Sequence, residues 1–263
     1  GLDKKVQNKP KGWHSTWDFG PQDYAKSKFT DHVVATWVTE QLGIKHGKPI
    51  FLACGFYRPH VPFFPPRDVY DSLKDVQLPR VDDNDWSDIP DAARNLSMSN
   101  PKIPTHDWMR DKGRWKEAVQ CYLACVRWTD EQLGRVLDAL NQGPHAKNTI
   151  IVLFSDHGYH LGEKQRWSKF SLWERTTHVP LIISVPNGIK GKTNKPVELL
   201  SLYPTLIDLC GLPENPKLEG VSLQPLLKDP KADWKHAAIS TLGQNNHAVR
   251  DERWRYIRYA DGS

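Results

Sequence analysis

Residues 148–169, which read NTIIVLFSDHGYHLGEKQRWSK, constrain the fold more than any other stretch. An apolar, β-branched run over residues 149–154 stops abruptly at Ser-Asp-His-Gly. Such a run predicts a buried strand, and the glycine-containing loop after it places an acid beside an imidazole. In open α/β sheets, ligands bind at the carboxyl ends of the strands. The stretch therefore predicts a metal site at Asp156 and His157, because carboxylates are ligands of Ca²⁺ or Mg²⁺ and imidazoles are more often ligands of Zn²⁺. The alternative is an Asp that caps the turn and a His that packs in the loop.

Cationic and imidazole side chains follow other predicted strands. Lys169 lies beyond a Gly-Glu-Lys turn after the same strand, where it could neutralise an oxyanion or simply be solvated. His60 follows an apolar run over 49–56, and the prolines around it restrict the backbone and direct the side chain. A lone His is more often structural, and Arg58 beside it carries a weaker signal. These residues alone leave both interpretations open.

Bulk composition excludes several classes of protein. The 263 residues suit one large domain or one and a half, and eleven Trp compensate for a hydrophobic content of 38%. A net charge of +5, spread along the chain without a basic stripe, does not indicate nucleic-acid binding. The sequence contains no apolar run of about 18 residues, so we expect no membrane span. Cys54 and Cys210 lie in apolar runs that predict burial, and Cys121 and Cys125 share one face of a predicted helix.

Periodicity predicts the order of the elements. Helices are expected at 31–45, with Asp31 as its cap, and at 66–73, 113–140, 170–175 and 197–209. Buried strands are expected at 49–56, 149–154 and 178–186, and a short antiparallel meander at 237–241, 247–251 and 254–259. Residues 74–113 lack clear periodicity and predict a long covering segment. The alternation of helices with buried strands indicates an α/β fold.

Five motifs in order carry a resemblance to a known family. They are FLACGFYRPHVPF, the amphipathic helix, TIIVLFSDHGYHLGEKQRWSKFSLWERTTHVPLIISVP, ELLSLYPTLIDLCGLP and HAVRDERWRYIRY. Together they resemble the type I sulfatases of the alkaline phosphatase superfamily, and most closely the iduronate-2-sulfatase-like branch. The resemblance implies a mixed, mainly parallel sheet sandwiched by helices, followed by the start of a small antiparallel subdomain. It implies sulfate ester hydrolysis, with sulfated carbohydrates or other sulfate esters as substrates.

The resemblance also implies roles for individual residues. Asp156 and His157 would ligate a divalent cation, Ca²⁺ in most of the family, although many relatives carry Asn where this chain has His157. Lys169 would contact the sulfate oxygens and His60 the leaving-group oxygen. Arg58 and His160 would bind substrate. A metal, a Lys and a His suit this chemistry, because negative charge moves to the bridging oxygen as the ester is cleaved.

The family's nucleophile motif has no match in this sequence. That nucleophile is a formylglycine made from Cys in Cys-x-Pro/Ala-x-Arg, whereas Cys54 is followed by Phe56 where Pro or Ala is required. The acidic pair Asp82-Asp83 lies in the covering segment and not after an early strand. We therefore expect an incomplete sulfatase. Residues 1–235 would form a partial α/β domain without its first strands, and 236–263 the start of the terminal subdomain.

Two other functions stay open at this stage. A phosphatase or phosphonate hydrolase of the same superfamily would share the fold but use more metal ligands or another nucleophile. A non-catalytic chain could instead bind a sulfated glycan through its many Trp and its basic loops. By family, a periplasmic, secreted or lysosomal location is expected.

Overall fold

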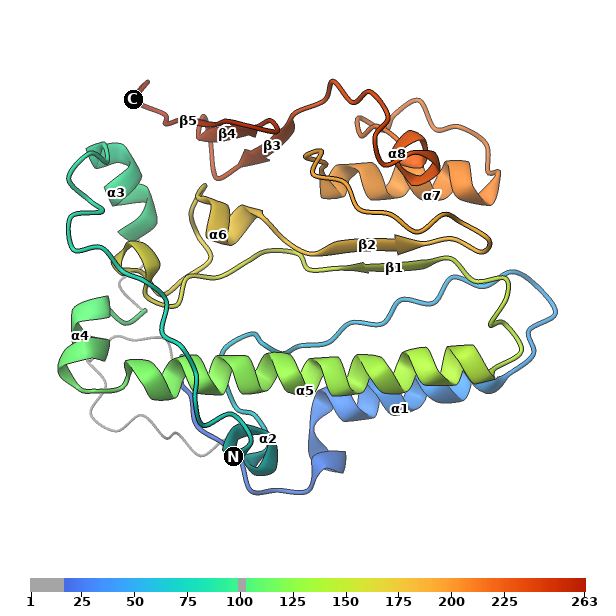
Figure 1. The fold of residues 1–263 in the computed structure, drawn as a ribbon, viewed down its shortest axis with the longest axis horizontal. Helices are drawn as coiled ribbons and strands as arrows, with labels where there is room; N and C mark the ends of the chain where they lie inside the picture. The colour runs from blue at the N-terminus through green and yellow to red at the C-terminus, as the bar shows by residue number, and fades with distance from the viewer. Residues whose placement is uncertain (1–16, 99–102) are drawn as a thin grey trace. The chain divides into compact units, whose positions relative to one another are not determined.

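The structure is a computed structural model that describes residues 17–98 and 103–263 (Figure 1). Contacts divide these residues into two compact units that are interleaved along the chain. The first comprises residues 17–85, 103–149 and 161–167, and the second comprises 86–98, 150–160 and 168–263. The terminal meander belongs to the second unit, where Ala248 and Tyr259 share a buried cluster with Leu172 and Trp173. The predicted domain boundary at residue 235 stays a prediction. Residues 1–16 and 99–102 of the predicted first domain lie outside the described residues.

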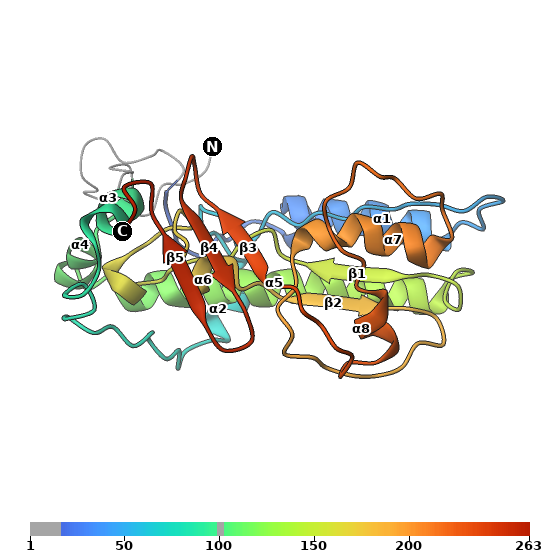
Figure 2. The ribbon, with the colours of Figure 1, turned by 90° about the horizontal axis from the view of Figure 1, so that it is seen from above.

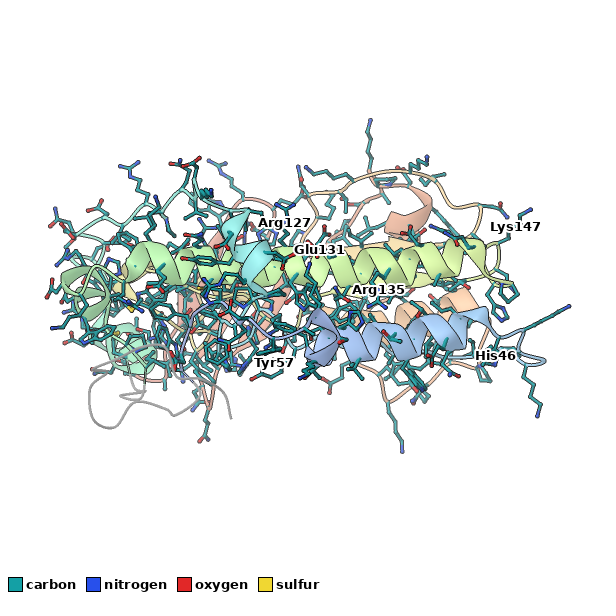
Figure 3. All side chains as sticks on the ribbon, turned by 90° about the horizontal axis from the view of Figure 1, so that it is seen from below. His46, Tyr57, Arg127, Glu131, Arg135 and Lys147 are labelled. Atoms are coloured by element: carbon teal, nitrogen blue, oxygen red, sulfur yellow. The ribbon has the colours of Figure 1, made fainter. Side chains whose placement is uncertain are left out.

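Two long helices lie side by side in the first unit. α1 (Thr30–Gly43) packs along α5 (Trp115–Gln142), as Figures 1 and 3 show. Both helices were predicted from their periodicity, and both are confirmed. No helix among the described residues, α5 included, combines the length and apolar character needed to cross a membrane. The unit also contains the short elements η1 (Lys26–Lys28), α2 (Arg67–Asp71), α4 (His106–Asp111) and η2 (Glu163–Gln165).

An aromatic cluster and an arginine join α1 to α5. Trp128 of α5 is 1% exposed, and its ring lies 5.3 Å from that of Phe29, which immediately precedes α1. Arg135 of α5 donates to Thr36 Oγ1 in α1 at 2.9 Å and to Gln132 Oε1 at 2.8 Å. Figure 3 shows Arg135 between the two helices. The pair is thereby fixed by apolar burial and by directed hydrogen bonds.

The second unit contains two separate sheets (Figure 2). β1 (Ile151–Phe154) pairs antiparallel with β2 (Leu181–Ser184), with Ile151 opposite Ser184. β3 (Ala238–Thr241), β4 (His247–Arg250) and β5 (Arg255–Arg258) form the predicted antiparallel meander. The helical elements of the unit are α3 (Asp91–Met98), α6 (Glu174–Thr177), η3 (Leu199–Ser201), α7 (Leu202–Cys210) and α8 (Gln224–Lys228). Leu226 of α8 belongs to a buried cluster against which Leu181 and Ile183 of β2 pack.

The structure differs from prediction at the strands expected to be buried. Residues 49–56 form no strand among the described residues, and Phe51 is 85% exposed. The strands β1 and β2 are confirmed, but they pair antiparallel and Phe154 is half-exposed. An apolar run indicates a tendency to be buried, whereas a strand also requires a neighbouring backbone to satisfy its N–H and C=O groups. The mixed α/β class therefore holds, while the mainly parallel pairing is not found among the described strands.

Candidate functional site

Backbone hydrogen bonds fix the loop that follows β1. Ser155 N donates to Pro180 O at 3.3 Å, and Gly158 N donates to Thr176 O at 2.9 Å. Gly158 lies so close to the next segment that a Cβ at this position would overlap the carbonyl oxygen of Arg175. The loop therefore needs glycine for a close approach of two backbones, and this approach holds the two residues before it in place.

The side chains of Asp156 and His157 lie next to each other in this loop. His157 Nδ1 lies 2.8 Å from Gly158 O, and because a carbonyl can only accept, Nδ1 carries the proton. The lone pair of neutral His157 is then on Nε2, which lies 3.7 Å from Asp156 Oδ2. The Asp156 side chain is 83% exposed. These two donors suit a shared cation, but no group of three or more His, Cys, Asp or Glu suited to a metal occurs among the described residues.

His160 is buried in the second unit. It is 1% exposed, its backbone N–H donates to Ser168 O at 3.1 Å, and its Nε2 lies 3.2 Å from Ser171 Oγ. Its ring packs edge-on against Trp173, with the centroids 5.7 Å apart. These contacts join the chain on either side of the 161–167 segment. The structure thus shows a packing role for His160, and its contact with substrate stays a prediction.

Lys169 immediately follows Ser168, whose carbonyl accepts from His160 N. Its Nζ lies 5.9 Å from the centre of the Phe170 ring, a cation–π distance. Its backbone carbonyl accepts from Ser171 N at 2.9 Å, which closes a tight turn. The side chain is partly exposed, and among the described residues it makes no ion pair. Such a cation is available to an anionic group.

His60 is held in the first unit by its own loop. Its Nδ1 lies 2.8 Å from Val61 O and 3.0 Å from the Tyr57 hydroxyl, which itself donates to Val61 O at 2.7 Å. The ring is exposed, and its centroid lies 5.0 Å from that of Tyr57. Burial raises the pKa of Tyr57, with a further increase from Asp31 and a decrease from Arg58, so the hydroxyl stays a donor at neutral pH.

Arg58 points away from solvent. It is 8% exposed, and its Nη1 lies 3.6 Å from Oδ2 of the buried Asp31. The guanidinium also lies 5.7 Å from the ring centre of Phe29. Asp31 does not cap α1 as predicted: the N-cap is Phe29, and Asp31 Oδ1 accepts from Tyr57 N at 2.6 Å instead. The predicted contact of Arg58 with substrate is untested, and the structure shows this side chain in an ion pair.

The six predicted site residues are divided between the units. His60 and Arg58 belong to the first unit, and Asp156, His157, His160 and Lys169 to the second. Sequence reasoning missed Tyr57 and misread Asp31. The signal for Tyr57 was its spacing, since a Tyr three residues before a His in a turn can reach the imidazole. Asp31 gave no such signal, because its partner lies 26 residues away.

Comparison with protein families shows where this chain resembles a known family. The family model described as Sulfatase matches residues 4–212. That range includes both the 57–62 loop and the 155–158 loop.

Individual proteins show the same likeness. A protein of Formosa agariphila named Sulfatase is 43% identical over 249 residues, which cover 94% of this chain and 49% of that protein. Human iduronate 2-sulfatase is 35% identical over 248 residues, covering 78% and 44% of the two chains. The chain thus spans about half the length of the curated relatives that it matches. A phosphonate monoester hydrolase from Silicibacter pomeroyi superimposes with a TM-score of 0.75 at 23% identity, covering 90% of this chain and 53% of that one. The last likeness concerns the fold alone, which agrees with the alkaline-phosphatase-like α/β fold that was predicted.

Proposed function

The chain belongs to the sulfatase family, and from this premise we propose that the whole protein hydrolyses sulfate esters of carbohydrates. The observation that carries the proposal is the family match over residues 4–212, which includes both loops with candidate site residues. The identity to human iduronate 2-sulfatase supports a sulfated uronate or a similar sugar as the substrate. The family branch and the substrate are both parts of this proposal.

Asp156 and His157 would hold a divalent cation, with Ca²⁺ as our proposal. When bound, such an ion stabilises negative charge on an ester oxygen. Oδ2 of Asp156 and Nε2 of His157 are 3.7 Å apart, and the His157 tautomer leaves a lone pair on Nε2. The remaining ligands would come from parts of the protein that this chain does not span.

Lys169 would neutralise the sulfate group. Its ammonium ion carries a full charge on a flexible stem, which suits a non-bridging oxygen of an anion. His160 would contribute to the substrate site, as the resemblance implies, by holding the turn that carries Lys169 through its bond to Ser168. Sulfate binding by Lys169 then depends on His160, which can remain buried because it acts only through the turn.

His60 would act at the leaving-group oxygen. The alcohol leaves as an oxyanion unless it is protonated, so a positioned imidazolium can donate a proton as the S–O bond breaks. Its Nε2 is the atom available for this transfer, because Nδ1 is bound to Val61 and Tyr57. Arg58 would support the site by its positive charge near the base of the same loop. The formylglycine nucleophile would lie in a part of the protein outside this chain.

The test is hydrolysis by the whole protein of an aryl sulfate and of a panel of monosulfated sugars. His60→Gln and Lys169→Ala are expected to lower kcat/KM by about a hundredfold or more. Lys190→Ala, which removes an exposed lysine from the segment after β2, is the matched control and should leave the rate unchanged.

Three outcomes would contradict the proposal. Faster cleavage of aryl phosphate or phosphonate esters than of sulfate esters would favour the other hydrolase of the superfamily. Binding of a sulfated glycan without turnover, surviving His60→Ala and Lys169→Ala together, would favour the glycan-binding alternative. Hydrolysis by the 263-residue chain at the rate of the whole protein would show that the nucleophile does not lie elsewhere.

A further inference from the structure

The tautomer of His60 is determined by the groups around its Nδ1. Val61 O lies 2.8 Å from this nitrogen and can only accept, so Nδ1 carries a proton in both charge states of the ring. The Tyr57 hydroxyl donates to the same carbonyl, and its oxygen lies 3.0 Å from Nδ1. Neutral His60 consequently has its lone pair on Nε2, and protonated His60 has its transferable proton there.

The segment that carries Tyr57 is itself fixed from two helices. Asp31 in the first turn of α1 is 1% exposed and accepts from Tyr57 N at 2.6 Å. Thr129 of α5 donates from Oγ1 to Arg58 O at 3.0 Å. Figure 3 shows Tyr57 beside the beginning of α1. Two adjacent residues of the loop are thus bound by their backbones to the rigid pair of helices.

The buried ion pair of Asp31 and Arg58 leaves part of its hydrogen-bonding capacity unused, so it contributes little to stability. Asp31 Oδ2 lies 3.6 Å from Arg58 Nη1, and among the described residues neither this oxygen nor Arg58 Nε has a hydrogen-bond partner. A well-packed apolar pair at such a position is often as stable or more stable. A carboxylate here does something that an apolar side chain could not: it binds the backbone N–H of Tyr57.

We propose that Asp31 and Tyr57 are positioning residues for His60, Asp31 by fixing the backbone at Tyr57 and Tyr57 by holding the imidazole through Nδ1. The inference rests on the proposed function, because it takes His60 Nε2 to be the atom that meets the leaving-group oxygen. Neither residue needs to touch substrate. Misplacement of the ring should therefore lower kcat while leaving KM nearly unchanged.

Tyr57→Phe in the whole protein is the decisive variant. It removes only the hydroxyl of a side chain that is 46% exposed, so it should change little buried area. We expect kcat on an aryl sulfate to fall about tenfold to a hundredfold with KM within about twofold. Tyr70→Phe, which removes a hydroxyl from α2 of the same unit, is the control and should retain the wild-type kcat. Asp31→Ala, which removes the acceptor of the Tyr57 N–H, should also lower kcat, but it leaves Arg58 unpaired and so loses stability as well.

Long-range ¹H–¹⁵N correlation spectra of the imidazoles give a readout that does not depend on turnover. His60 signals are assigned by their loss in His60→Gln. All variants should keep the proton on Nδ1, because Val61 O remains its acceptor. Wild-type protein and Tyr70→Phe should show one sharp set of His60 ring signals, whereas Tyr57→Phe and Asp31→Ala should show signals broadened by motion of a ring that Tyr57 no longer holds. Equally sharp His60 signals and an unchanged kcat in Tyr57→Phe would overturn the inference while leaving the proposed function intact. Full activity in His60→Gln would instead contradict the role of His60 in the reaction. The spectra of the wild type and of Tyr57→Phe would still show whether Tyr57 holds the His60 ring.

Discussion

Arg255 of β5 binds Glu174 of α6 through two of its nitrogens. Nη2 lies 2.7 Å and Nε 2.9 Å from Glu174 Oε2, and Arg255 Nη1 also donates to Leu172 O at 3.0 Å. Arg250 and His178 lie 3.4 Å and 3.1 Å from the same carboxylate. One acid on a four-residue helix thus connects the terminal meander to the segment that follows the 155–169 region.

Glu174→Gln should destabilise the protein in a pH-dependent way. Partial burial by itself raises the pKa of Glu174, but Arg255, Arg250 and His178 outweigh it and lower the pKa from its ordinary value of 4.5. A carboxyl whose pKa is lower in the folded protein than in the unfolded one stabilises the fold at pH values above its unfolded-state pKa. That stability is lost as the pH falls through its folded-state pKa. Because the carboxylate is half-exposed, we expect a loss of about 1 kcal/mol at pH 7.

Urea unfolding of wild type and Glu174→Gln at pH 7 and at acid pH measures this difference. The two proteins should converge once the pH is well below 4.5. Glu214→Gln, at an exposed position in a loop, serves as the control and should match the wild type throughout. A Glu174→Gln deficit that persists in acid would show that charge is not its cause.

Metal removal should destabilise the whole protein if Asp156 and His157 hold a cation. A ligand at a hundredfold excess over its Kd stabilises the native state by about 2.7 kcal/mol, so chelation should lower the melting temperature measurably. Asp156→Asn should abolish the difference between protein with Ca²⁺ and protein with chelator. Asp208→Asn, on the exposed side of α7, should keep it. The 263-residue chain alone should show weak binding at most in calorimetry, since it supplies two adjacent ligands.

Gly158→Ala should damage the 155–158 loop far more than an ordinary glycine substitution. The added Cβ would overlap the backbone of Arg175, and backbone cannot be displaced as a flexible side chain can. We expect a loss of about 1–3 kcal/mol from overpacking, together with weaker Ca²⁺ binding by the whole protein. Gly134→Ala is the matched control, because nothing lies within 4 Å of its Cβ position and it sits inside α5. There the substitution should add about 0.5–1 kcal/mol of stability.

Helices were predictable here because their signal is local. The apolar residues of 113–140 recur with one period, and the observed α5 begins and ends within two residues of that range. The meander was equally local, since its three strands follow one another with short turns. The 49–56 run was not predictable, because whether it pairs depends on another backbone and not on its own composition.

The site shows the same division between local and distant information. Asp156 and His157 were predicted as a pair because adjacency is visible in the sequence, and their side chains lie 3.7 Å apart. His60 and Arg58 were predicted in the same way, and the roles of all four stay predictions. Asp31 was read as a helix cap from its position, whereas its actual partner is the backbone of Tyr57. A hydrogen bond to a main-chain N–H leaves no trace in the identity of the residue that donates it.

The cysteines provide a last prediction. The burial predicted for two of them from the apolar residues around them was wrong. Cys54 and Cys210 were predicted to be buried, yet both are exposed, while Cys121 and Cys125 are buried in α5. Burial raises the pKa of the Cys121 and Cys125 thiols far above the ordinary value, so neither forms the reactive thiolate at neutral pH. Partial burial, and then the charge of Asp31, also raise the pKa of Cys54.

Thiol labelling of the native chain at pH 8 should therefore proceed in three stages. Cys210 should react first and Cys54 more slowly, because the thiolate is the reacting species. Cys121 and Cys125 should react only after unfolding in guanidinium. Cys210→Ser and Cys54→Ser identify the two native reactions, since each variant should lose one of them. Rapid labelling of a third thiol in the native protein would show that α5 opens locally, and its rate would then measure the free energy of that opening.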